Sequence, residues 1–182
     1  MKICIVTIAT NQYLQFVERL LTDIENHFLS GNDFHCLLCT DHEVEVSDNV
    51  KVSLIEHKPW PEPALKKYNY IDAESDFLKD FDYVYLFDAD VGIVDDVGEE
   101  VLQDLVGVLH PYKFFENKSV YPYEKRQGST AYIADEDHDK YYAAAFVGGK
   151  TETFLKMAKT IAGRVEQDER NGIIAKWHDE SH

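Results

Sequence analysis

Two aspartates separated by one residue, Asp88 and Asp90, directly follow a short apolar run, Tyr83–Phe87. Residues two apart on an extended chain point the same way, so both carboxylates leave the strand end on one face. Two hard oxygen ligands on one side suit Mg²⁺ or Mn²⁺ shared with the phosphates of a substrate. Acidic-x-acidic triplets also occur at 80–82, 135–137 and 137–139. Only the Asp88 pair follows an apolar strand, where open α/β sheets bind ligands; a solvated turn is the alternative.

The segment 177–182, Trp-His-Asp-Glu-Ser-His, gathers several side chains that could do chemistry. His178 and His182 have the i, i+4 spacing of a zinc protease motif, but that motif needs Glu directly after the first His. Sugar chemistry fits better, because the Trp177 indole can pack against a pyranose and the Asp179 and Glu180 carboxylates can bind hydroxyls or stabilise an oxocarbenium ion. An ordinary acidic terminus is the alternative.

A second enzyme class competes for the aspartate pair. Phe87-Asp88-Ala89-Asp90 loosely resembles the nucleophile loop of haloacid-dehalogenase-type phosphatases, in which the first Asp is phosphorylated and the second is a general acid. That loop normally follows the first strand, whereas here some 80 residues precede it. The phosphatase is therefore the weaker interpretation.

The elements that must position these residues alternate along the chain. Strands are expected at 2–8, 34–39, 50–55 and 83–87, and an apolar segment at 143–147 precedes Gly148-Gly149. Helical spacing is expected over 13–28, 65–78, 97–109 and 151–165. Strands that alternate with helices predict an α/β fold with a mostly parallel, doubly wound sheet.

Length and composition predict one domain over residues 1–182, in which 45% of residues are hydrophobic. The formal net charge of −16 disfavours binding to nucleic acid or to an anionic membrane. It also makes a divalent cation the simplest means of binding a phosphate-bearing substrate. No apolar stretch approaches the roughly 20 residues of a membrane span, and the N-terminus reads as a buried strand. Three cysteines fit a reducing compartment, so a cytoplasmic location is expected.

Read together, the motifs resemble glycosyltransferase family six, which includes the histo-blood-group A and B transferases, the α1,3-galactosyltransferases and their bacterial and viral relatives. The resemblance covers essentially the whole chain. The motifs that carry it, in order, are Ile8-Ala9 with Tyr13, Phe87-Asp88-Ala89-Asp90, Val97-Gly98 with Leu109-His110-Pro111, Tyr123–Arg126 with Ala131–Ile133, Tyr141–Gly149, and Asn171–Ile173 with Trp177–His182.

This resemblance implies a GT-A fold and a retaining, α1,3-type transfer of galactose, N-acetylgalactosamine or a related hexose from a UDP-sugar to a glycan acceptor, with Mn²⁺ or Mg²⁺ as cofactor. Asp88 and Asp90 would hold the metal and, with Ala89, the UDP diphosphate. Glu180 would lie beneath the anomeric carbon as a nucleophile or electrostatic support. The nucleotide would also contact Ile8, Ala9, Tyr13 and Lys67.

The implied sugar sites are formed by other residues. Ala143, Ala144 and Ala145 would line the donor sugar pocket, and Asp179 would bind donor hydroxyls. The acceptor side would be shaped by His110, Pro122, Trp177 and His178. The chain departs from the family at several of these positions: Lys67 replaces an Arg and loses its bidentate hydrogen bonding, Pro122 stands where relatives often place Thr, and Ala143 is smaller than the usual residue.

Family members continue for several dozen residues past the position of His182. The resemblance therefore implies either a truncated chain or an open site, and an open site favours hydrolysis of the donor by water. A non-catalytic module of the same fold that binds UDP or a glycan is the second hypothesis.

Overall fold

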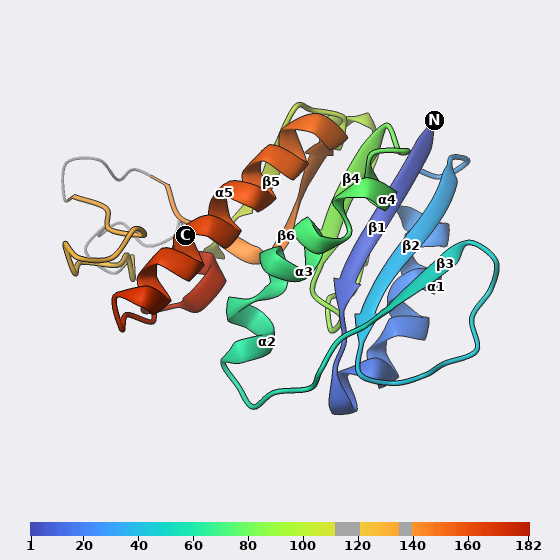
Figure 1. Cartoon of the computed structure of the whole chain (residues 1–182). Coiled ribbons are helices and arrows are strands. Elements are labelled where there is room, and N and C mark those ends of the chain that lie inside the picture. The colour runs from blue at the N-terminus through green and yellow to red at the C-terminus, as the bar shows by residue number, and fades with distance from the viewer. Residues whose placement is uncertain (112–120, 135–139) are drawn as a thin grey trace.

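The computed structural model describes residues 1–111, 121–134 and 140–182. It contains a six-stranded sheet in the order β3-β2-β1-β4-β6-β5 (Figure 1). Neighbouring strands among β1 to β4 pair in parallel, whereas β6 is antiparallel to both β4 and β5. This confirms the expected α/β fold with a mostly parallel sheet. The strands are β1 (Lys2–Ile8), β2 (Asp33–Thr40), β3 (Val50–Leu54), β4 (Tyr83–Phe87), β5 (Val106–Leu109) and β6 (Tyr142–Lys150).

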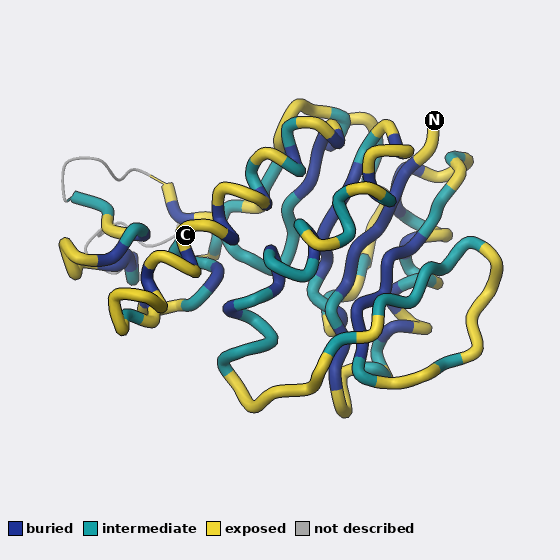
Figure 2. The backbone as a smooth tube through the Cα atoms, viewed as in Figure 1, coloured by how far each residue is buried: buried dark blue, intermediate teal, exposed yellow. Residues whose placement is uncertain are grey.

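Helices cover both faces of the sheet. On one face, α1 (Val17–His27) packs Leu20 and Ile24 against Ile3 and Ile5 of β1. The other face carries α3 (Lys67–Ala73), α4 (Ser75–Leu78) and α5 (Thr151–Arg170), which pack against the alternate residues of β1. Since both faces are covered, the middle strands are buried along most of their length (Figure 2). The described residues also include α2 (Glu62–Leu65) and the 3₁₀-helices Asn11–Phe16, Glu99–Val101 and His178–Ser181.

Strand β6 lies between β4 and β5 because two glycines allow a close approach. A Cβ on Gly148 would lie 2.1 Å from a ring carbon of Tyr85 on β4. Gly149 has a φ of +151°, and a Cβ there would lie 2.4 Å from the carbonyl oxygen of Asp104. The Gly148-Gly149 pair therefore lets the antiparallel strand lie directly beside the strand that ends at Asp88.

Two predicted helices are corrected by the structure. The predicted helix over 97–109 is wrong: the segment forms a bridge between Val97 and Phe28, a short 3₁₀-helix and strand β5. Pairing with β6 outweighs the apolar spacing there. The predicted helix over 65–78 is divided among α2, α3 and α4, although its apolar anchors are buried as expected. In the described part of the chain, no helix has both the length and the apolar character that a membrane crossing requires.

The topology brings the candidate site residues to one edge of the sheet. Strands β1 and β4 are parallel neighbours, so Ile8 and Asp88 emerge at the same edge. The antiparallel start of β6 lies there too, since Phe146 pairs with Phe87 and the Asp88 amide donates to the Ala145 carbonyl at 3.0 Å.

Candidate active site

A cavity of about 410 Å³, called here the first cavity, opens at this edge of the sheet. It lies between the ends of β1 and β4, the segment 57–67 and the 3₁₀-helix His178–Ser181. Its lining residues are Ile8, Thr10, Asn11, Gln12, Tyr13, His57, Lys58, Trp60, Pro63, Ala64, Lys67, Asp88, Ala89, Asp90, Ala144, Trp177, Asp179 and Glu180.

The loop after β4 is held by α1. The Arg19 guanidinium donates to the Asp90 carbonyl at 3.0 Å and to the Val91 carbonyl at 3.2 Å. The Asp23 carboxylate accepts the Ile93 amide at 3.3 Å. These bonds fix the backbone around Asp90, whose side chain is exposed.

Lys67 forms the electrostatic centre of the cavity. Its side chain is buried, and its ammonium lies 2.7 Å from Asp88 Oδ1 and 2.9 Å from Asp179 Oδ2. Burial by itself lowers the pKa of Lys67, but Asp179 and Asp88 outweigh it and hold the pKa above its ordinary value. Burial raises the pKa of Asp179 to about 6, against the opposing effect of Lys67. One cation shared by two carboxylates leaves this centre with net negative charge, which favours binding of a further cation.

Glu180 is held by two hydrogen bonds from the β6 region. Its Oε1 accepts from the Tyr141 hydroxyl at 2.7 Å, and its Oε2 accepts from the Ala144 amide at 3.0 Å. The turn that carries it is closed by the Trp177 amide, which donates to Ser181 Oγ at 2.9 Å. Glu180 is therefore fixed as an acceptor at the wall of the first cavity.

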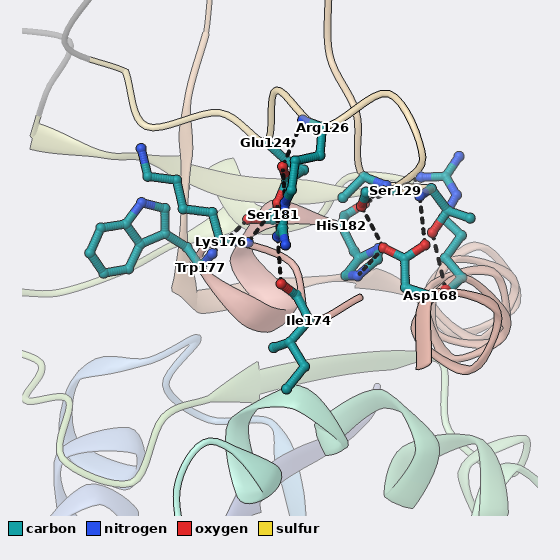
Figure 3. Close-up of polar contacts among 12 residues, drawn as sticks. Glu124, Arg126, Ser129, Asp168, Ile174, Lys176, Trp177, Ser181 and His182 are labelled. Atoms are coloured by element: carbon teal, nitrogen blue, oxygen red, sulfur yellow. Dashed lines mark hydrogen bonds and ion pairs between the residues drawn. The ribbon is translucent and has the colours of Figure 1, made fainter. Parts of the chain in front are cut away.

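The turn around Glu180 is attached to the segment 121–134 through a buried carboxylate, Glu124 (Figure 3). Glu124 accepts from Arg126 Nε at 2.9 Å and Nη2 at 2.6 Å, and from the Lys176 amide at 2.8 Å. Arg126 also donates to the Ile174 carbonyl at 2.5 Å. The hydrogen bonds from Arg126 lower the pKa of Glu124 to about 2, so the carboxylate stays ionised.

A second attachment lies at the end of α5 (Figure 3). Asp168, which is buried, accepts from the Ser129 hydroxyl and from the Thr130 amide, the latter at 2.7 Å. The buried His182 ring lies 3.9 Å from the same carboxylate. Burial lowers the pKa of His182, and Asp168 opposes this effect. The segment 121–134 is thus joined to both α5 and the turn that carries Glu180.

Aromatic side chains surround the entrance of the first cavity. Tyr13, Trp60 and Trp177 line the cavity and are exposed, with Trp60 73% accessible. The Trp60 ring lies 4.4 Å from the His178 ring in an edge-to-face contact. Exposed indole faces beside carboxylates are typical of carbohydrate sites.

The structure brings most of the predicted site residues together. Ile8, Tyr13, Lys67, Asp88, Ala89, Asp90, Ala144, Trp177, Asp179 and Glu180 all line the first cavity. The other six predicted residues lie outside its lining. Ala9 is buried in the core; Ala145 provides its carbonyl to Asp88; His178 contacts Trp60. The His110 amide donates to the Tyr141 carbonyl, and Ala143 lines a neighbouring cavity. Pro122 lies in the chain between Tyr121 and Tyr123, which form an aromatic cluster with Tyr141.

Sequence reasoning missed the segment around His57, Lys58 and Trp60. A basic pair followed by Pro-Trp-Pro in an acidic chain is a signal that could have found it. It also missed Tyr141 as a partner of Glu180, because that contact spans 39 residues.

The donor set at Asp88 and Asp90 fits a hard divalent cation only in part. Two carboxylates line the same cavity, and the described residues contain no cluster of three or more His, Cys, Asp or Glu that could hold a metal by itself. A cation here would need further oxygen ligands from a bound phosphate and from water, which is how Mg²⁺ and Mn²⁺ are usually held. The residues therefore fit a metal that binds together with its substrate.

The known proteins that match the chain are glycosyltransferases. A family model described as "Glycosyltransferase family 6" matches residues 1–182. The chain is 30% identical to "Globoside alpha-1,3-N-acetylgalactosaminyltransferase 1" of Gallus gallus, covering 96% of this chain and 54% of that protein. It is 30% identical to "Histo-blood group ABO system transferase 1" of Rattus norvegicus, covering 96% of this chain and 53% of that protein. It is 29% identical to "O-antigen biosynthesis glycosyltransferase WbnI" of Escherichia coli, covering 100% of this chain and 80% of that protein. The chain thus spans about half the length of the vertebrate relatives.

Proposed function

The chain belongs to glycosyltransferase family 6, and from this premise we propose that it transfers a hexose from a UDP-sugar to a glycan acceptor with retention of configuration. Its mixed α/β sheet is the GT-A type that this family adopts. The observation that carries the proposal is the first cavity, which gathers Asp88, Asp90, Lys67, Asp179 and Glu180 at the carboxyl ends of β1 and β4. The α1,3 linkage and the extent of the catalytic domain, residues 1–182, are parts of the same proposal.

The nucleotide would enter beside the end of β1. Ile8 and Tyr13 would contact uracil and ribose, with the buried Ala9 supporting that wall from behind. His57 and Lys58, which are exposed and line the same cavity, would face the diphosphate. Lys58 adds positive charge where an anionic donor meets a strongly acidic protein.

Asp88 and Asp90 would hold Mn²⁺ or Mg²⁺ against the diphosphate. When bound, the metal supplies Lewis-acid stabilisation of the charge that develops on the leaving UDP. Lys67 holds Asp88 in place from the protein side. Its single ammonium reaches both Asp88 and Asp179, so it links the two halves of the site without the planar fork of an Arg.

Glu180 would stabilise the positive charge that develops at the anomeric carbon, as a nucleophile or as an electrostatic support. The bond from this carbon to the UDP oxygen breaks, a bond to the acceptor oxygen forms, and the proton of the acceptor hydroxyl passes to the leaving diphosphate. Asp179 would accept hydrogen bonds from donor hydroxyls. The small side chains of Ala143, Ala144 and Ala145 would leave space beside the donor sugar.

The acceptor would bind at the aromatic side of the cavity. Trp177 offers an indole face next to Glu180, and His178 is held against Trp60. His110 and Pro122 lie beside the cluster that contains Tyr141, and the Tyr141 hydroxyl in turn donates to Glu180. Without an acceptor, water would take its place and the donor would be hydrolysed. We expect the reaction in the cytoplasm.

The experiment is a panel of UDP-sugars incubated with the purified chain, with Mn²⁺ or with chelator, in which UDP release is measured without added acceptor. Release from one donor that requires Mn²⁺ is the expected result and identifies the donor sugar. Absence of release from every donor, together with retained binding of UDP and Mn²⁺, would indicate a binding module and contradict the proposal.

A further inference from the structure

A second cavity of about 360 Å³ adjoins the first. The two cavities share Ala144, Asp179 and Glu180 as lining residues, and Ala143 also lines the second. The proposed function assigns these residues to the donor sugar and its anomeric carbon. The hexose of the donor would therefore extend from the first cavity into the second, where the lining side chains would contact its substituents.

Apolar side chains form much of the wall of the second cavity, among them Val147 of β6 and Met157 and Ile161 of α5. Such a wall can pack against the carbon–hydrogen face of a sugar ring, but it offers no hydrogen bond to a sugar hydroxyl. A hydroxyl that entered the cavity without a partner would lose its hydrogen bonds to water, which is unfavourable. The polar atoms of this cavity therefore decide which substituents a sugar can place in it.

Tyr68 of α3 carries a hydroxyl that this cavity can offer to a ligand. The residue is only 5% exposed, and its ring belongs to the same core cluster as Ile161 of α5. Within the described part of the chain the Tyr68 hydroxyl makes no hydrogen bond, and its oxygen is nonetheless accessible. Since Tyr68 lines the second cavity, this hydroxyl opens into it.

The surroundings of the Tyr68 hydroxyl keep it neutral. Burial raises the pKa of Tyr68; Lys67 opposes this effect, whereas Asp179 and Asp88 add to it. The phenol therefore stays protonated at neutral pH, where it can donate one hydrogen bond and accept another. A buried hydroxyl without a partner costs free energy in the free protein, and a ligand that supplies the partner recovers this cost.

From this geometry we propose that Tyr68 is a specificity-determining residue whose hydroxyl binds a hydroxyl of the donor hexose in the second cavity. The inference rests on the proposed function and specifies its donor: a UDP-hexose with a free hydroxyl at this point is preferred to the corresponding deoxy sugar. Lys67 lines the first cavity and Tyr68 the second. Two successive residues of α3 would thus serve the metal-binding part and the sugar-binding part of one donor site.

The test uses the UDP-sugar that gives the most UDP release, together with analogues that each lack one hydroxyl of the hexose. Wild type should prefer the parent sugar to one of these analogues by at least about ten-fold in kcat/KM, because the analogue leaves the Tyr68 hydroxyl unpaired. Tyr68→Phe should reduce this preference to about two-fold or less. The preferences at the other positions of the sugar should stay unchanged.

Tyr70→Phe is the matched control. Tyr70 lies on the same helix and lines neither cavity, so this variant should keep every preference of wild type. Tyr68→Phe should also unfold at the wild-type temperature, because the hydroxyl that it removes has no partner in the described fold. Thermal unfolding thus separates a role in sugar recognition from a structural role, which would lower the stability of the variant.

The outcomes distinguish this inference from the proposed function. UDP release with equal kcat/KM for the parent sugar and every analogue, or with the same preferences in wild type and Tyr68→Phe, would overturn the inference and leave the proposed function intact. If no UDP is released, isothermal titration with UDP, UDP-galactose, UDP-N-acetylgalactosamine and UDP-glucose decides.

In that titration, a gain in affinity from the sugar that Tyr68→Phe removes and Tyr70→Phe keeps would support the role of Tyr68 although the proposed catalysis fails. Equal affinity for UDP and all three UDP-sugars, or a gain that Tyr68→Phe leaves unchanged, would overturn the inference.

Discussion

Glu180 and its two donors show how a single carboxylate is positioned for chemistry. The Tyr141 hydroxyl and the Ala144 amide fix both oxygens, and Tyr141 itself is buried in a cluster with Tyr121 and Tyr123. A carboxylate oriented before substrate binds needs no reorganisation as charge develops beside it. In the proposed reaction, Tyr141 would therefore be a positioning residue that acts through Glu180.

Tyr141→Phe tests this role. Loss of one hydrogen bond to a charged group should lower kcat for UDP release about ten-fold. The KM for the donor should stay unchanged, because Tyr141 does not line the first cavity. Steady-state kinetics of both parameters is the measurement. Tyr123→Phe is the matched control, since its hydroxyl donates to the Lys140 carbonyl and not to Glu180, and it should reduce stability without the selective loss of kcat.

At the scale of elements, the sequence predicted the local features best. The strand over Tyr83–Phe87 and the paired carboxylates after it are set by residues close in the chain, and so is the apolar face of α5. Strand β5 could not be predicted from spacing alone, because its state depends on pairing with β6, some 35 residues later. The attachment of Glu124 to Lys176 was equally hidden, since it joins residues 52 apart.

The Glu124 attachment makes a prediction about stability. Glu124→Gln should lower the free energy of unfolding by about 2–3 kcal/mol at pH 7, because it removes the charge that Arg126 and the Lys176 amide bind. The pKa of Glu124 is lowered in the fold, so its contribution is full above the ordinary value of 4.5 and is lost as the pH falls towards about 2. Urea denaturation at pH 7, 4 and 3 measures the free energy of unfolding. The difference in this free energy between wild type and variant should become smaller as the pH falls.

Glu25→Gln, on the exposed side of α1, is the control for this series and should change stability little at any of the three pH values. A Glu124→Gln variant as stable as wild type at pH 7 would show that the segment 121–134 is attached to the turn by other contacts.

The whole molecule carries a formal charge of −16, and four carboxylates line its first cavity. An anionic diphosphate can bind such a cavity well only if cations compensate, and Lys58 and Lys67 supply part of that charge. In the proposed reaction, a divalent cation at Asp88 and Asp90 would supply the rest. The described residues contain no cluster of three or more His, Cys, Asp or Glu, so the proposed cation would take its remaining oxygen ligands from the diphosphate and from water.

Binding of UDP should therefore depend on the divalent cation, whereas binding of uridine should not. Chelator is expected to weaken UDP binding at least about 100-fold and to leave the Kd of uridine, which lacks the diphosphate, unchanged. Isothermal titration of both ligands with Mn²⁺ and with chelator measures this. Equal UDP affinity in both conditions would show that Lys58 and Lys67 alone bind the diphosphate.

We propose that the first cavity catalyses hexosyl transfer with Glu180 beside the anomeric carbon. UDP release from the UDP-sugar panel by wild type and Glu180→Gln, measured side by side with Mn²⁺, tests this proposal. Glu152→Gln, at an exposed position of α5, is the control. We predict a loss of at least about 100-fold in Glu180→Gln, with UDP affinity unchanged and full activity in Glu152→Gln. A Glu180→Gln variant that releases UDP at the wild-type rate would contradict the claim.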